Sequence, residues 1–159
     1  MDPQLSDHKL FIGFQIGPEP RGSSFDHFMD CLSLLIQSTR EHLRKSYTRP
    51  ETLFVLSFRA PGDFRNQWRW FSEGVFGVRH SRIQSMVSAS IGVPNAVGLS
   101  NDATTIAAFV AEKVREAMRA VIDRAESGGI AVEEDALFHD LEMALDHFER
   151  RAASSRKRK

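Results

Sequence analysis

Three residues with metal-binding or acid–base side chains recur at helical spacing in the last third of the 159-residue sequence. His139, Glu142 and Asp146 stand at i, i+3 and i+7, so a helix would present one imidazole and two carboxylates on one face. Ligands from neighbouring turns of a single exposed helix lack the closed geometry and the supporting hydrogen bonds that metal sites need. The pattern therefore predicts a solvated acidic helix face, with no metal site and no catalytic residue.

A second pair of reactive residue types is His27 and Cys31, which lie one helical turn apart. An imidazole at that spacing could act as a base toward the thiol. The alternative that we favour is a small packed thiol, because an unpaired cysteine in an apolar stripe usually belongs to the core. As the single cysteine, Cys31 excludes an intramolecular disulfide and a cysteine-based zinc cage, and it favours a reducing, cytoplasmic location.

Motifs that are tied to a known reaction are absent from the sequence. It has no Walker loop, no GxGxxG after a strand, no GxSxG and no HExxH. We therefore predict that the protein is not an enzyme and binds no cofactor. An unrecognised active site would require several of the histidines to converge in one pocket: His8, His27, His80 and His139.

Large aromatic residues and arginines alternate in the segment 68–71, Trp-Arg-Trp-Phe. Trp68 and Trp70 are predicted either to close the end of the core or to anchor a protein interface, since tryptophan and arginine are enriched at such interfaces. A nucleic-acid surface is the third alternative. It would use a set of basic residues in the middle of the chain and at its end: Arg65, Arg69, Arg79, Arg82, Arg156, Lys157, Arg158 and Lys159.

The charges are sorted into blocks, although the formal net charge is zero. Residues 1–39 carry 2 Lys/Arg and 5 Asp/Glu, residues 40–100 carry 9 and 4, residues 101–149 carry 4 and 12, and residues 150–159 carry 6 and none. Such sorting steers charged partners toward one surface. It favours a binding protein over a catalyst.

The elements that must position these residues follow from periodicity and from turn residues. Alternating apolar residues predict strands at 8–16, 52–58, 73–78 and 81–91, the last two forming a hairpin. Apolar residues at three- and four-residue steps predict helices from Ser23 or Ser24 to about Tyr47, from the caps at 100–102 to Gly128, and from about Glu133.

This order, β-α-β-β-β-α-α, predicts an α+β fold with a mostly antiparallel sheet of about four strands and three helices. Residues 1–149 are expected to form a single domain and residues 150–159 a basic, disordered tail. No apolar run approaches the roughly 18 residues of a membrane span. The N-terminus lacks a basic region followed by an apolar stretch, so no export signal is expected.

With this plan the chain resembles the small α+β immunity proteins of bacterial polymorphic-toxin and contact-dependent inhibition systems. The resemblance covers residues 8–150 and includes the stretch from Phe71 to Pro94. It implies non-enzymatic neutralisation of a toxin, in which the protein binds the toxin domain and blocks its active site or its access to a target.

We therefore predict a module that binds another protein, such as a basic toxin domain. The expected contact residues are acidic side chains near the last helix together with the two tryptophans: Glu133, Glu134, Asp135, Asp140, Glu142, Asp146, Glu149, Trp68 and Trp70. The alternative function is a nucleic-acid-associated regulatory protein that uses basic residues of the 40–82 region and the C-terminal tail. A homo-oligomer is also possible, because the strand at 53–58 could be covered by a second copy of the chain.

Overall fold

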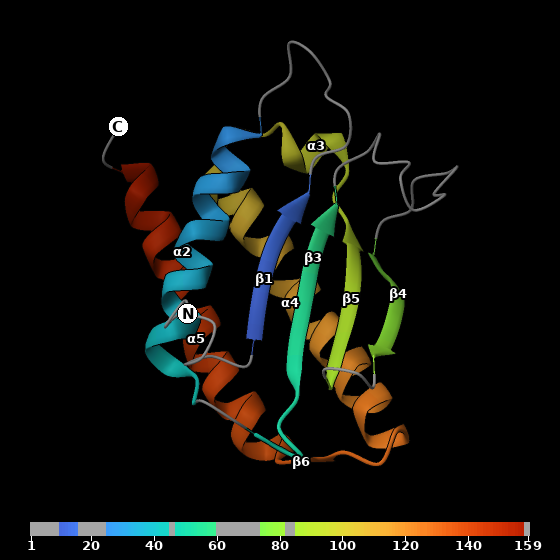
Figure 1. Cartoon of the computed structure of the whole chain (residues 1–159). Helices are drawn as coiled ribbons and strands as arrows, with labels where there is room; N and C mark the ends of the chain where they lie inside the picture. Colours follow the sequence, from blue (N-terminus) through green and yellow to red (C-terminus); the bar gives the residue numbers. More distant parts are fainter. Residues whose placement is uncertain (1–9, 16–24, 45–46, 60–73, 82–84, 158–159) are drawn as a thin grey trace, which may run out of the picture.

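The computed structural model describes residues 10–15, 25–44, 47–59, 74–81 and 85–157. One four-stranded sheet carries all its long helices on the same side (Figure 1). The predicted α+β class is confirmed. The elements, in chain order, are β1 (Leu10–Gln15), α2 (Asp26–His42), β2 (Thr48–Arg49), β3 (Leu53–Arg59), β4 (Gly74–Ser81), β5 (Met86–Gly92), α3 (Asn95–Gly98), α4 (Ala103–Ser127), β6 (Ala131–Val132) and α5 (Glu134–Lys157).

The main sheet is mixed, with strand order β1-β3-β5-β4. β1 pairs with β3 in parallel, β3 pairs with β5 in parallel, and only β4 and β5 are antiparallel. The prediction of a mostly antiparallel sheet is therefore wrong. α2 forms the crossover that parallel neighbours need between β1 and β3. The predicted β4–β5 hairpin is correct, but β5 inserts between β3 and β4 and so runs parallel to β3.

The two faces of the sheet differ in burial. Phe54, Leu56 and Phe58 alternate with half-buried residues along β3, and Val87, Ala89 and Ile91 do the same along β5. The buried set faces the helices, as the period of two requires. β3 is central, as its sequence predicts, but its second set of side chains is only half-buried.

The helices form two layers behind the sheet. α2 covers β1, and α4 covers β3, β5 and β4. α5 packs on α2 and α4 rather than on the sheet, through a stripe with the predicted spacing: Leu137, Leu141, Leu145 and Phe148, each at most 1% exposed. Ala152 continues this stripe at 0% exposure. The apolar core therefore runs through α4 from the sheet to α5.

The boundaries of α4 follow the local signals in the sequence, and those of α2 depart from them. Asp102 caps α4, as predicted, by accepting a hydrogen bond from the Thr104 N–H at 3.1 Å. The helix ends at Ser127 with Gly128 as its C-cap, and the next residue, Gly129, takes the left-handed φ of 88° that favours glycine. α2 is preceded by Phe25 instead of a serine cap, and its helical residues end at His42.

The domain boundary predicted at residue 149 lies too early. α5 continues to Lys157, Ala152 is buried, and Arg151 donates hydrogen bonds to Gln37 at 3.1 Å and Glu41 at 3.2 Å on α2. The helix continues because Ala152 lies seven residues after Leu145, on the same apolar stripe. Residues 150–154 therefore belong to the folded body.

A polar contact joins α5 to the segment before β3. β2 and β6 form a two-stranded antiparallel sheet, and the Glu133 N–H donates to the Tyr47 carbonyl at 2.8 Å. The Tyr47 hydroxyl accepts from the Arg44 N–H at 2.7 Å and donates to Asp140 Oδ2 at 2.6 Å. Burial, followed by the bond to Asp140, raises the pKa of Tyr47. These bonds fix the first turns of α5 against the chain between α2 and β3.

Tyr47→Phe should lower the free energy of unfolding by about 1–3 kcal/mol, because Asp140, 14% exposed, loses a hydrogen bond that water replaces only in part. Urea unfolding measures the change. Asp146→Asn on the same helix is the control: it breaks an exposed pair with Arg150 and should change stability by less than about 0.5 kcal/mol. Equal effects of the two variants would contradict the role given to Tyr47.

Candidate functional site

The exposed side of α5 is the strongest candidate for a binding site. Because the leucines and Phe148 occupy one stripe of the helix, the polar residues between them face outward. Glu134 and Asp135 lie in the first turn, where the helix dipole favours negative charge. A shallow, open depression follows along this side, lined by Asp135, Phe138, His139, Glu142, Met143 and Asp146.

Apolar groups lie inside the acidic rim of this depression, which we call the α5 depression. Met143 is 49% exposed, one of three large apolar side chains that the described residues leave exposed. Phe138 is half-buried, and the guanidinium of Arg119 on α4 lies 5.2 Å from the centre of its ring. The depression therefore offers an adaptable apolar contact surrounded by carboxylates.

Arg115 on α4 neutralises part of the acidic rim. Its Nε and Nη2 donate to the two carboxylate oxygens of Glu142 at 2.7 and 2.9 Å, and Glu149 lies 3.8 Å away. The hydrogen bond to Arg115 lowers the pKa of Glu142, and the same bond raises the pKa of Arg115. Glu142 and Glu149 thus share one guanidinium, and the surface is less negative than the sequence predicts.

The remaining acidic residues of the rim are more available to a partner. Asp146 pairs at 2.7 Å with Arg150 one turn later, and both side chains are exposed, so the pair contributes little and a partner can replace it. Asp135 is exposed and forms no ion pair with any residue that the structure describes. Asp135 and Asp146 are therefore the two carboxylates best placed to attract a cation.

The structure corrects the place given to Asp140. Its side chain is 14% exposed and is held by the Tyr47 hydroxyl and by Arg44 Nε at 3.5 Å, so it does not lie on the solvated face. The helical period predicts that Asp140 lies beside the buried stripe, but it does not predict the residues that contact the Asp140 side chain. Asp140 is a structural residue and leaves the set of candidate contacts.

Two carboxylates meet where α4 turns into α5. Glu126, near the end of α4, is hydrogen-bonded to Glu134. Desolvation, this hydrogen bond and the negative charges of Glu134 and Asp123 raise the pKa of Glu126. This end of the helical hairpin therefore carries concentrated negative charge, next to the exposed Glu133 and Asp135.

The residues proposed for chemistry do not assemble into a reactive site. Cys31 is 3% exposed, and burial, with a smaller contribution from Asp30, raises its pKa to about 11. It is a packed thiol rather than a nucleophile. Among the described residues, no group of three or more His, Cys, Asp or Glu side chains could hold a metal ion.

The histidines that an active site would require in one pocket lie on separate elements: His27 on α2, His80 on β4 and His139 on α5. His8 lies outside the described residues.

A histidine pair that the sequence did not indicate joins α2 to α5. The rings of His42 and His147 have centres 5.1 Å apart. A search for apolar stripes on two helices that face each other could have found it, because both residues flank those stripes.

Several predicted contact residues fall on the part of the chain that is not described. Trp68, Trp70, Arg65, Arg69, Arg82, Arg158 and Lys159 lie outside the described residues, and the side chains of Arg156 and Lys157 are not described either. Of the basic set proposed for nucleic acid, Arg79 is described, and it is exposed on β4. Of the acidic set, Glu133, Glu134, Asp135, Glu142 and Asp146 are exposed, and Glu149 is half-buried.

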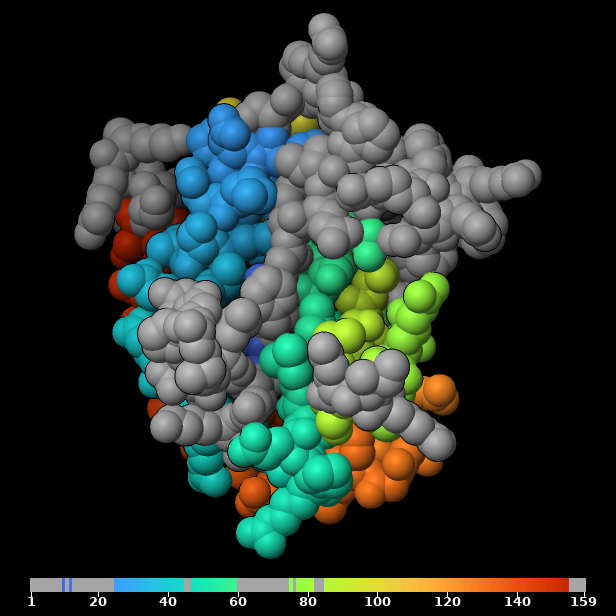
Figure 2. Space-filling model, viewed as in Figure 1, coloured from blue at the N-terminus to red at the C-terminus, as the bar shows by residue number. Residues whose placement is uncertain are grey.

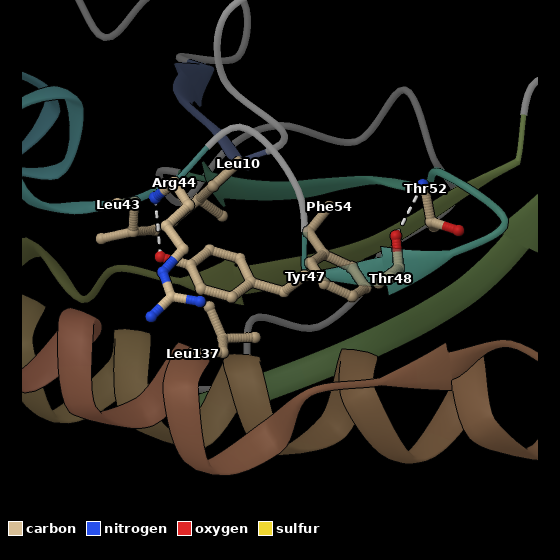
Figure 3. A pocket seen from close by; sticks show the side chains of 8 residues that line it. All are labelled: Leu10, Leu43, Arg44, Tyr47, Thr48, Thr52, Phe54 and Leu137. Carbon is tan, nitrogen blue, oxygen red and sulfur yellow. Dashed lines mark hydrogen bonds between the residues drawn. The ribbon is translucent and has the colours of Figure 1, made fainter.

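An enclosed pocket next to Tyr47 is structural. Figure 3 shows its lining side chains, which come from β1, β3, α5 and the segment after α2. Its cavity measures about 10 Å³, close to what a single water molecule needs. It therefore has no room for a substrate or cofactor.

No family model matches the chain, and comparison with the curated proteins and with the solved structures found no match. Within the described part of the chain, no helix has the length and apolar character of a membrane span. The site must therefore be interpreted from its own geometry.

Glu126→Gln should raise the Tm at pH 7, because a raised folded-state pKa means that the ionised carboxylate destabilises the fold. The gain should be present above the folded pKa and vanish as the pH falls below the ordinary value of 4.5, where Glu126 is protonated in both states. Thermal unfolding at pH 7 and pH 3.5 measures it. Glu116→Gln is the matched control on α4: it removes a 3.0 Å pair with Lys113 and should not raise the Tm at either pH. A gain at both pH values would contradict the assignment.

Proposed function

We propose that the chain is a non-enzymatic protein-binding module that neutralises a toxin domain by binding it, as immunity proteins do. The observation that carries this proposal is the α5 depression, where exposed Met143 lies between the carboxylates of Asp135 and Asp146. An apolar centre with a charged rim is the usual composition of a protein interface.

The charge of the rim selects a basic partner. Asp135 has no counter-ion among the described residues, and Asp146 can exchange Arg150 for a cation of the partner. Complementary charge mainly raises the association rate, whereas the buried apolar contact sets the lifetime of the complex. A toxin that acts on nucleic acid presents a basic cleft, and such a cleft is complementary to this rim.

The state of Cys31 supports a reducing, cytoplasmic location for the proposed module. The thiol is free and buried, and its raised pKa keeps it protonated at neutral pH. Glu142 and Asp146 of α5 form ion pairs with Arg115 and Arg150 on an open surface rather than around a closed pocket. An open surface of this kind supports contact with another macromolecule rather than with a small substrate.

The triple variant Asp135→Lys, Met143→Lys, Asp146→Lys should abolish capture of the partner while leaving the fold intact, since all three side chains are exposed. The full chain serves as bait in a lysate of the source cell, and mass spectrometry identifies what is retained. The retained protein is then purified, its association rate with each variant is measured at low and high salt, and its toxicity is tested by expression with and without the chain.

Asp30→Lys, an exposed charge reversal on α2, is the matched control and should retain the same partner. The proposal requires that the captured protein be basic, that it be toxic when expressed alone, and that the toxicity be suppressed by the wild-type chain and not by the triple variant. A captured protein that binds the triple variant equally well would contradict the assignment to α5, and one that is harmless alone would contradict neutralisation.

A further inference from the structure

The four-stranded sheet carries no acidic residue. Its four strands contain two charged side chains, Arg59 at the end of β3 and Arg79 on β4. The acidic residues of the second half of the chain lie mostly on α4 and α5, on the helical side of the sheet. The charged side chains of the four strands are therefore all positive, whereas acidic and basic side chains are mixed on α4 and α5.

Both arginines belong to the face of the sheet that the helices do not cover. Arg59 alternates with the buried Phe58 on β3. Arg79 stands opposite Ser88, which alternates with the buried Val87 and Ala89 on β5. Figure 2 views the molecule from this side, where atoms of β3, β4 and β5 are visible.

Three serine hydroxyls lie between the arginines. Ser57 on β3 is paired in register with Ser90 on β5, and Ser88 precedes Ser90 by two residues on the same face. All three are half-buried. Arg59 Nε donates to Ser90 Oγ at 3.1 Å, which draws the guanidinium toward β5. Arg79 flanks Ser88, roughly 7 Å further along the strand.

We propose that this face, defined by Ser57, Arg59, Arg79, Ser88 and Ser90, binds the phosphate groups of a single-stranded nucleic acid. Guanidinium and hydroxyl groups are the usual donors to phosphate oxygens. Because these donors are spread over three strands, the face is better suited to successive phosphates of a nucleic-acid strand than to one small anion.

Other anionic partners fit this face less well. A membrane surface would require exposed apolar side chains beside the arginines, but the large apolar side chains that the described residues leave exposed, Met29, Leu99 and Met143, lie elsewhere. The face also lies on the side of the sheet opposite α5, so it is separate from the α5 depression. Binding of nucleic acid to this face can therefore be tested independently of the proposed toxin partner.

The test uses the full chain and labelled 12-nucleotide single-stranded RNA and DNA, with affinity measured by fluorescence anisotropy at several salt concentrations. Arg79→Gln should weaken binding about tenfold and reduce the slope of log K against log salt by about 0.7, the value for one lost phosphate contact on a single strand. The double variant Arg59→Gln, Arg79→Gln should reduce the affinity and the salt slope further. Arg79 is exposed, so its replacement should leave the Tm unchanged.

Arg49→Gln is the control with the same loss of charge, because Arg49 is exposed on β2, outside the main sheet. It should change affinity less than twofold. Equal losses for Arg49→Gln and Arg79→Gln, or no binding by the wild-type chain at 50 mM salt, would overturn the proposal. Polyglutamate and unlabelled oligonucleotide are also compared as competitors at the same concentration of charge. Equal competition by the two would overturn the proposal, because the face would then recognise any polyanion. Arg49, Arg59 and Arg79 all lie outside α5, so the effects of these variants bear only on the sheet and leave the proposed protein partner untouched.

Discussion

The burial of α4 on both sides is the constraint from which the architecture follows. Ten of its 25 residues are buried, including Ile106, Val114 and Val121. A helix that is apolar over so much of its circumference is stable only between two other layers. The sheet supplies one cover and α5 the other. Each fully buried aliphatic side chain contributes about 1.5–3 kcal/mol, so this double contact outweighs any single polar interaction, including that between Tyr47 and Asp140.

The same layering decides which charges reach the surface. α5 must turn its leucine stripe inward, so its carboxylates face outward, and α4 lies close enough for Arg115 to hold Glu142 at 2.7 Å. The opposite face of the sheet receives residues that alternate with Phe58 and Val87, and these include serines and arginines. The layers thus differ in charge: the charged side chains of the four strands are arginines, whereas acidic and basic side chains are mixed on the helices.

Features that depend on neighbouring residues could be predicted from the sequence, whereas features that depend on contacts between distant residues could not. The period of α5, the Asp102 cap and the β4–β5 hairpin follow from neighbouring residues and were predicted correctly. The insertion of β5 between β3 and β4 was missed because strand order depends on contacts between distant residues. The acidic side of α5 was predicted, but its effective charge was not: Asp140 meets Tyr47 across 93 residues and Glu142 meets Arg115 across 27. Ala152 was assigned to a tail because the charged residues around it hid one apolar position.

The position of α5 in the chain has a consequence for synthesis. It is the last described element to leave the ribosome, and until Leu141, Leu145 and Phe148 have emerged, the sides of α2 and α4 that they cover remain in contact with water. A nascent chain at that stage exposes apolar surface and is prone to aggregation. The helix that closes the core is also the helix that carries the acidic depression. The α5 depression therefore forms only when this helix packs on α2 and α4, in the same step that covers their apolar sides.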